Sequence, residues 1–501
     1  MQDRRELERA RIDGRAAFAG AAYLIGVGLF FLLDRVGAPD GLVRALGPLF
    51  ALAGLALLGL LTRSTRVPAF FAADRAIPAP YAGLAFAAIA AGLVLCLGPP
   101  GDSPLPLAGV ALGLLVGALA VAPLLRASGA SAASDLMATR FASRPLRLVL
   151  AALLFVIGAL VATAGFEAAA NALIGLFALS RGAAATIVAA VVALMIVPGG
   201  LAGLIWGAAA SAGIVLIIVY LPIVGRLFAS DAAIWPPLRE AGLWSDTLAR
   251  SWNAGAGDFE ADLLVVVASA LAIAALPLFA APAAASPGER QAFRAGGFGL
   301  IFAALIGLAA FIDPIVWPTP SAPMTSGLKS SAILLAALAL AAAGALSASR
   351  AWGLTNAGGF DRQHPPLASQ RLARSRALAL VVIALCAGLA GRLVFEPKFA
   401  IVAAATAALG LIAPVLALAL FSRATSAHAI ASLSASLATA LVLGALEGRV
   451  PDAGRLLIGA LSAAAAGFAA GWSIAIFSRE GRKRTAPLGD LFIDAPLDPR
   501  A

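Results

Sequence analysis

Two charged side chains lie within long apolar segments of this 501-residue chain, where charge is rare. The first is Glu167, embedded in the stretch 146–177 within the sequence ATAGFEAAANALI. An ionisable residue inside a membrane span is a functional candidate by default, because removing its charge from water is costly. Burial favours the neutral form of a carboxyl group, so Glu167 is a candidate proton acceptor. The alternative interpretation is a carboxylate that stays wetted by an outer vestibule.

Arg350 is the second interior charge, and it follows two hydroxyl residues in the sequence ALSASRAWG of the stretch 327–357. Ser347 and Ser349 could line a polar path or supply oxygen ligands to a cation. Arg350 could act as a fixed interior cation, but we favour snorkelling of its guanidinium to the cytoplasmic surface. A direct bridge to Glu167 is not expected, because at about 1.5 Å per residue the two lie roughly 6–10 Å from the midplane on opposite sides.

Residue types that commonly hold metals or cofactors are scarce and scattered. Cys96 and Cys386 both lie within apolar stretches, so neither a disulfide nor a thiolate metal site is expected. His364 and His428 lie in or beside loops without spaced partners, and we interpret them as solvated. We therefore expect no catalytic residues, no cofactor and no metal centre. The net charge of +10 is spread over short loops, which does not indicate nucleic-acid binding.

The elements that must position these residues are apolar helices. Hydrophobic residues make up 61% of the chain, charged residues make up 12%, and the mean hydropathy is +0.96. About 20 consecutive apolar residues cross a bilayer as a helix, because hydrocarbon offers backbone amides no other partner. The sequence therefore predicts an all-α polytopic membrane protein. Its fourteen candidate spans are residues 15–33, 42–62, 77–98, 105–125, 146–177, 182–198, 201–225, 261–282, 295–312, 327–357, 377–394, 399–421, 427–446 and 455–477.

Basic residues are unequally divided between the two sides of these spans. With the amino terminus inside, 24 of the 36 Lys and Arg residues lie in inner loops and ends, 11 lie outside, and Arg350 lies within a span. Cytoplasmic loops carry the excess of positive charge in membrane proteins. We therefore predict a multi-pass protein of the inner cell membrane with both termini in the cytoplasm.

Several short motifs follow one another in a recognisable order. They are FFAADRAIP at 70–78, ASDLMATRF at 133–141, PGGLAGLIW at 198–206, LPLFAAP at 276–282, ERQAFRAGGF at 289–298 and the basic stretch 371–376. Taken together, over about residues 50–445, they resemble the sodium:solute symporter family, and most closely its acetate-permease-like branch.

The resemblance implies the LeuT-type inverted-repeat fold, in which five helices are followed by five more related by a pseudo-twofold axis. The ten-helix transporter core would then occupy residues 77–421. Around this core we expect a cytoplasmic N-terminal segment at 1–14, two flanking helices in 15–62, two C-terminal helices in 427–477 and a cytoplasmic tail at 478–501.

The resemblance also implies two interrupted helices beside the binding site, here 77–98 and 261–282. Pro277 and Pro282 independently favour a break in the second of these, since each removes a backbone donor. We expect residues 270–282 to be locally non-helical, although an ordinary kink near a helix end explains the two prolines equally well. In 77–98 the small residues permit close approach of another helix but do not require a break.

The positions that the family uses for its cation differ here from the family pattern. Ile89 and Leu95 take the places of an aspartate and a serine in the first core helix, and residues 343–346 of the eighth contain no hydroxyl group. Sodium needs several oxygen ligands. Sodium coupling is therefore doubtful, and coupling to protons through Glu167 is the alternative.

The resemblance implies a secondary transporter that moves a small organic solute by alternating access, by analogy a short monocarboxylate. The candidate substrate and ion-site residues are Glu167, Ser347, Ser349 and Arg350. The expected partners are the lipid bilayer and the solute, while a small partner subunit stays unidentified. The alternative is a transport-inactive symporter-like receptor or assembly subunit that keeps the fold without the ion chemistry.

The orientation can be tested by cysteine labelling of intact cells. Cysteines introduced at Ser103 and Ser321 should react with an impermeant thiol reagent from outside, because both lie in predicted outer loops. A cysteine at Ser369, in a predicted inner loop, should react only after the membrane is permeabilised. The reverse pattern would overturn the orientation.

Overall fold

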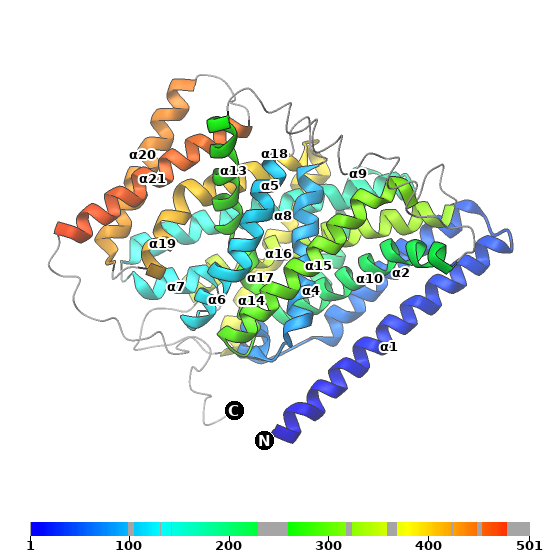
Figure 1. The fold of residues 1–501 in the computed structure, drawn as a ribbon. Coiled ribbons are helices and arrows are strands. Elements are labelled where there is room, and N and C mark those ends of the chain that lie inside the picture. The colour runs from blue at the N-terminus through cyan, green and yellow to red at the C-terminus, as the bar shows by residue number, and fades with distance from the viewer. Residues whose placement is uncertain are drawn as a thin grey trace.

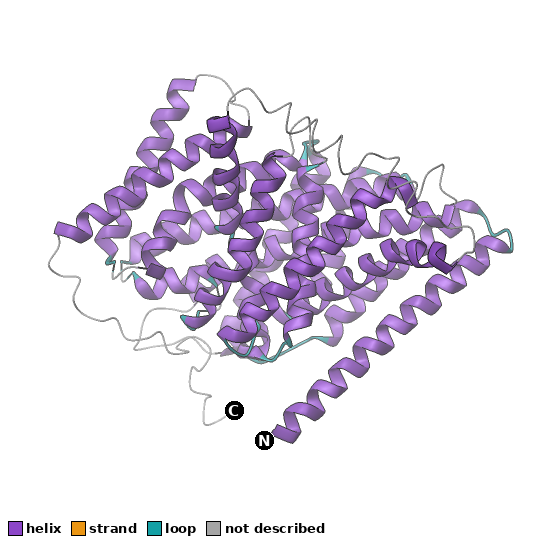
Figure 2. Ribbon diagram, viewed as in Figure 1, coloured by secondary structure: helices purple, strands orange, loops and turns teal. Residues whose placement is uncertain are grey.

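The structure is a computed structural model in which the described residues are overwhelmingly helical, and none of them forms a strand (Figure 2). The residues that it describes are 2–98, 105–130, 132–141, 143–228, 259–316, 323–357, 368–421, 424–447 and 453–477. The tail predicted at 478–501 and the labelling sites Ser103 and Ser321 lie outside these residues. The prediction of an all-α protein is confirmed.

All fourteen predicted spans lie in helical segments of the described chain (Figure 1). The main helices are α1 (Gln2–Arg35), α2 (Asp40–Leu61), α4 (Ala79–Leu97), α5 (Leu105–Val116), α6 (Ala122–Ala127), α8 (Arg144–Phe177), α9 (Arg181–Ile196), α10 (Leu201–Phe228), α13 (Phe259–Ala274), α14 (Ala280–Ala284), α15 (Glu289–Val316), α16 (Pro323–Ala357), α17 (Ala368–Arg392), α18 (Pro397–Ala407), α19 (Ala413–Phe421), α20 (Ser426–Glu447) and α21 (Ala453–Phe477). Short helices α3 (Val67–Ala72) and α7 (Ala133–Arg140) lie in connections.

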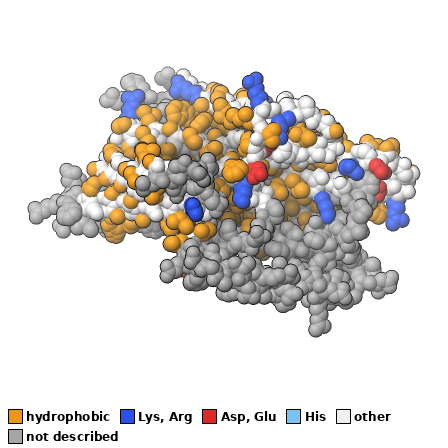
Figure 3. Space-filling model, turned by 90° about the horizontal axis from the view of Figure 1, so that it is seen from above, with side chains coloured by type: hydrophobic (Ala, Val, Ile, Leu, Met, Phe, Trp, Pro, Cys, Tyr) orange, Lys and Arg blue, Asp and Glu red, His pale blue; other side chains and the backbone are white. Residues whose placement is uncertain are grey.

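Most of these helices can cross a membrane. Within the described residues, eleven are long and apolar enough, and a bent pair, α13 with α14, makes a twelfth. The predicted span 15–33 lies inside the long helix α1, and the span 182–198 corresponds to α9, a shorter apolar helix of 16 residues. In the view from above, hydrophobic side chains are prominent on the described surface, with Lys and Arg side chains scattered among them (Figure 3). The chain is a multi-pass membrane protein.

The interior of the bundle is organised around α16, whose span is the most deeply buried of the described helices. Helix α8 crosses α16 at very close range, because glycines face the partner helix. A Cβ added at Gly165 would lie 2.5 Å from the amide nitrogen of Ala341, and one at Gly344 would lie 2.5 Å from that of Ala162. Small residues of this kind allow membrane helices to associate through backbone contact.

Helices of the two halves pack in equivalent pairs. Helix α4 packs extensively on α15, and α5 packs in the same way on α13. Glycine makes the approach possible in both pairs: Gly83 of α4 faces Phe298 of α15, and Gly109 of α5 faces Ser269 of α13. In an inverted repeat of five helices, the contact between core helices one and seven is equivalent to the contact between core helices six and two. Here α4 and α15 are the first and seventh core helices, and α13 and α5 are the sixth and second. The observed pairs therefore follow the repeat order predicted from the family resemblance.

Flanking helices complete the bundle. Helix α1 runs along one side and α20 with α21 stands at the opposite side (Figure 1). Two single-turn π-helical segments, η2 (Gly117–Val121) and η4 (Ala408–Ile412), interrupt the α5–α6 and α18–α19 spans. Both contact α13. Such π segments are rare in proteins, and those that occur often lie near functional sites.

The predicted interruption of the span 261–282 is confirmed. Helix α13 ends at Ala274, and a 3-10 turn η3 (Pro277–Phe279) begins three residues later. The segment Pro277–Ala284, which includes α14, lies at an angle of 52° to α13. Pro277 has no N–H group, so the carbonyl of Ile273 loses its usual partner and accepts from the amide of Leu276 instead, at 3.1 Å. The break is narrower than predicted, because residues 270–274 and 280–282 are helical.

The interruption expected in the span 77–98 is absent from the structure. Helix α4 is continuous from Ala79 to Leu97. Its small residues serve close packing instead: a Cβ added at Gly92 would lie 2.3 Å from the carbonyl oxygen of Ala336 in α16. The expectation came from the family resemblance alone, and the prolines of this span, Pro78 and Pro80, lie at the start of α4, where they do not break a helix.

The close crossing of α8 and α16 can be tested with matched glycine substitutions. Gly165→Ala should lower the free energy of unfolding by about 1–3 kcal/mol, because the added methyl group overlaps Ala341. Gly175→Ala is the control, since Gly175 lies on the same helix with nothing within 4 Å of an added Cβ. Thermal unfolding in detergent measures both. Equal stability of the two variants would contradict the observed crossing.

Candidate functional site

A narrow cleft lies beside the break between α13 and α14. It holds about 390 Å³ of space between atoms, part of it open to the surroundings. Its walls come from α7, α8, α10, α16 and the broken helix, so it lies where the two halves meet. The lining residues include Ser134, Pro277, Ala343, Ser347 and Arg350. A second, smaller cavity shares Ala133 and Pro277 with it and reaches the π-helical turn η2.

Arg350 is buried rather than extended to the surface. Its side chain is 3% exposed, and Nη2 donates to the carbonyl oxygen of Phe71 at 2.9 Å. The side chain of Asp135, in the first turn of α7, is also buried. The expected snorkelling of Arg350 is therefore wrong. A partner carbonyl in the distant segment before α4 holds the side chain in the interior.

The two candidate serines have different surroundings. Ser347 is half-buried and lines the cleft together with Arg350. Ser349 is buried, does not line the cleft, and donates to the carbonyl oxygen of Leu346 at 2.9 Å. The structure thus brings Ser347 and Arg350 together and leaves Ser349 in a local backbone contact.

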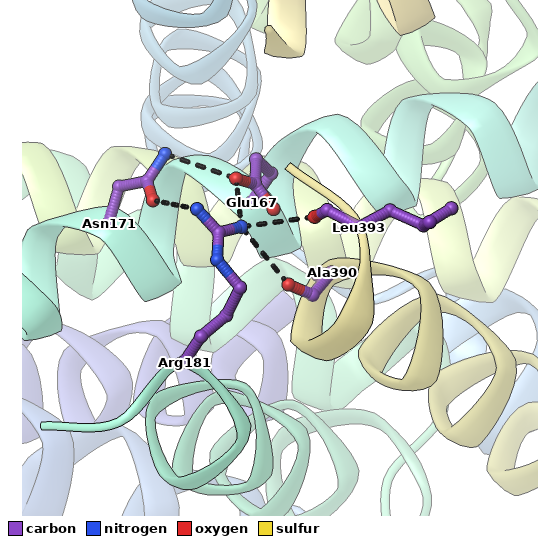
Figure 4. A network of polar contacts seen from close by, with 5 residues as sticks. All are labelled: Glu167, Asn171, Arg181, Ala390 and Leu393. Carbon is purple, nitrogen blue, oxygen red and sulfur yellow. Dashed lines mark hydrogen bonds and ion pairs between the residues drawn. The ribbon is translucent and has the colours of Figure 1, made fainter. Parts of the chain in front are cut away.

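Glu167 belongs to a separate polar cluster at the far end of α8 (Figure 4). Its side chain is fully buried, and Oε1 accepts from Arg181 in a short ion pair and from Asn171 Nδ2 at 3.3 Å. Among the described residues, Oε2 has no hydrogen-bond partner. Complete burial excludes the interpretation of a carboxylate wetted by a vestibule. The bridge to Arg350 is absent, as expected from its depth, because each residue has other partners.

Arg181 was not identified from the sequence, although it organises this cluster. Its Nη1 also donates to the carbonyl oxygens of Ala390 and Leu393, at 3.2 and 3.1 Å, where α17 ends. The cluster therefore joins α8, α9 and α17 (Figure 4). The available signal was its position as the first residue of α9, only four residues after the end of α8.

An equivalent arginine closes the opposite end of the α9–α17 pair. Arg376 of α17 donates from Nε to the carbonyl of Val197 and from Nη2 to that of Pro198, both at 3.1 Å, where α9 ends. Its guanidinium also lies 5.5 Å from the ring centre of Phe70. Each helix thus supplies an arginine to the C-terminal end of the other, where the helix dipole favours positive charge. This exchange fits two antiparallel, repeat-related helices.

The positions that the family uses for its cation are filled with apolar side chains. Ile89, Ala343 and Leu346 are buried members of one continuous hydrophobic core. Leu95 is a partly buried hydrophobic residue packed against the same core. Within the described residues, no group of three or more His, Cys, Asp or Glu side chains could hold a metal ion.

His428 differs from its interpretation as a solvated loop residue. It is 2% exposed and lies in the first turn of α20. Its Nδ1 accepts from the backbone amide of Thr425 at 2.9 Å, in the manner of a capping box. His428 therefore caps a helix, while His364 lies outside the described residues.

Comparisons with known proteins agree with this architecture. Residues 70–230 match the model of the sodium:solute symporter family. The fold is similar to a solved structure of a Na⁺-coupled sialic acid symporter in a substrate-bound outward-open state, with a TM-score of 0.68 and 16% identity over 86% of this chain and 97% of that chain. A search of curated proteins gave no significant match.

The family resemblance predicted from sequence is confirmed by this match, and the LeuT-type fold by the structural likeness. The acetate-permease-like branch stays a prediction. The match to the symporter family covers residues 70–230, and the likeness to the solved symporter shows the fold.

The Glu167–Arg181 pair can be tested by its effect on stability. Breaking a buried ion pair by removing one partner costs about 3 kcal/mol or more. Because the side chain of Arg181 is 24% exposed, Glu167→Gln should lower the free energy of unfolding by at most about 3 kcal/mol. Glu289→Gln removes an exposed carboxylate and is the control. Thermal unfolding of both variants measures the difference. If Glu167→Gln is as stable as the parent protein, the cluster does not hold these helices together.

Proposed function

We propose that this protein is a secondary transporter that moves a small organic solute across the inner cell membrane by alternating access, with both termini in the cytoplasm. The observation that carries the proposal is the break between α13 and α14, which lies beside a cleft formed by elements of both repeats. A helix interrupted at mid-bundle frees backbone groups for binding and is the usual feature of transporter sites.

A short monocarboxylate is the solute class that we propose. Support comes from the lining of the cleft, which is mainly Ala, Leu and Pro with Ser347 as a hydroxyl donor and Arg350 as a cation. Small apolar walls suit a short carbon chain, and a buried guanidinium favours a negatively charged head group.

Sodium is not the obligatory coupling ion in this proposal. The apolar residues Ile89, Leu95 and 343–346 supply no side-chain oxygen, and α4 keeps its own carbonyls in helical hydrogen bonds. A sodium ion about 5 Å from Arg350 would also be repelled by on the order of 3 kcal/mol at an effective dielectric of about 20, roughly a hundredfold in affinity.

Because side-chain oxygen ligands for sodium are lacking at these positions, we propose passive or proton-linked transport. Glu167 is the proposed proton site, because it is a fully buried carboxylate with one oxygen, Oε2, that lacks a partner among the described residues. Its other oxygen, Oε1, is held in the ion pair with Arg181.

A second candidate function is a transport-inactive receptor or assembly subunit. The continuous helix α4 and the apolar packing at the cation positions favour it, because both remove features that ion-driven transport uses. In that case a small partner subunit would be the functional ligand.

Uptake into proteoliposomes separates these functions. Labelled short monocarboxylates should accumulate or equilibrate with no steep dependence on sodium, and an imposed proton gradient should have no effect on the Glu167→Gln variant. Protein-free liposomes are the control. Sodium-dependent uptake that saturates at millimolar sodium would contradict the coupling proposal, and absence of uptake across a panel of small organic solutes would favour the receptor.

A further inference from the structure

The connection between α3 and α4 contains an unusual backbone conformation. Ala73, Asp74 and Arg75 have φ angles of 51°, 51° and 52°, so three successive residues other than glycine occupy the left-handed region. The Cβ atom is crowded in this region, and non-glycine residues normally visit it singly. Three in a row form a strained turn, which persists only when surrounding contacts hold it.

Contacts with three neighbouring elements hold this turn and the residues on either side of it. Arg75 Nη2 donates to the carbonyl oxygen of Gly129, after α6, at 2.8 Å. The amide of Ile77 donates to the carbonyl oxygen of Ala285, after α14, at 3.2 Å. On the other side of the turn, the carbonyl oxygen of Phe71 accepts from Arg350 of α16 at 2.9 Å.

These contacts connect the turn to the walls of the cleft. Arg350 lines the cleft, and α14 is the second half of the broken helix that borders it. Ala73 and Ile77 are themselves buried in the main hydrophobic core. These contacts therefore couple the conformation of the turn to the positions of α6, α14 and α16.

We propose that the turn Ala73–Arg75 is a strained latch that closes this end of the cleft, and that the cleft opens when the turn relaxes. The strain raises the free energy of the closed arrangement, and the bonds of Arg75 and Arg350 offset it. The balance between the two sets how often the cleft is open. This mechanism concerns the protein alone and does not depend on which solute or ion it carries.

The latch can be tested by the reaction rate of a cysteine in the cleft. Ser347→Cys, introduced into a parent with Cys96→Ala and Cys386→Ala, gives a protein with a single cysteine at the cleft wall. Modification of this thiol by a small maleimide, followed in native membranes, measures how often the cleft opens.

The first pair of variants changes the strain at neighbouring buried alanines. Ala73→Gly should slow the reaction roughly fivefold or more, because glycine adopts the left-handed region without steric cost and stabilises the closed arrangement. Ala72→Gly is the control, since Ala72 is also buried but has a φ of −134°. Equal rates for the two variants would overturn the proposal.

The second pair protects the test against misfolding of the buried variants. Asp74 is exposed, and its pairing with Arg66 at 3.8 Å is weak. Asp74→Gly should slow the reaction as Ala73→Gly does, whereas Asp74→Ala, which loses the same ion pair but keeps the strain, should not. An equal effect of these two substitutions would contradict the latch.

The third variant removes a restraint. Arg75→Ala should accelerate the reaction several-fold, because it deletes the bond to Gly129 and leaves the strain in place. Opposite effects of Ala73→Gly and Arg75→Ala on the reaction rate are expected only if the turn is strained and held by its contacts. A thiol that fails to react in every variant, or an Arg75→Ala variant that reacts more slowly, would overturn the proposal.

Discussion

Backbone polar groups in hydrocarbon must find their partners within the protein, and this constraint organises the whole structure. Along the helices the groups satisfy one another. At two helix ends, arginine side chains donate to the terminal carbonyl groups. In the antiparallel α9–α17 pair, Arg181 and Arg376 each bind the terminal carbonyls of the other's helix. Where helices cross, glycines such as Gly165 let backbones approach closely enough for dispersion forces to hold them. The two repeats are thereby locked together without a large polar interior.

The same constraint shows where movement is possible. At Pro277 a helix loses a donor, α13 and α14 part by 52°, and the cleft lies at that point. Arg350 links the cleft wall to the carbonyl of Phe71, and so to the strained turn before α4. By contrast, the cation positions around Ile89 are packed with apolar side chains. The chain thus keeps the broken helix, whereas the side chains at the expected cation positions contribute no oxygen atom.

The sequence predicted the helices and the break at Pro277 because apolar length and proline chemistry act locally. It did not predict partners that depend on how distant segments fold together. Arg350 was expected at the surface, but Phe71 lies 279 residues away in sequence and holds it inside. Glu167 was recognised as an interior carboxylate, yet its partner Arg181 sits on the next helix, and pattern alone does not pair them. The break expected in α4 came from family resemblance, whereas its residues favour the continuous helix that is observed.

The central claim is that this symporter-like fold does not use sodium at the position between α4 and α16. Hydrogen–deuterium exchange of the reconstituted protein tests it directly, because a bound ion protects the backbone amides around it from exchange. Exchange in α4 and α16 should be the same in 100 mM sodium as in 100 mM potassium. These concentrations are about a hundredfold above the dissociation constant of an ordinary cation site. Slower exchange in these two helices in sodium alone would contradict the account.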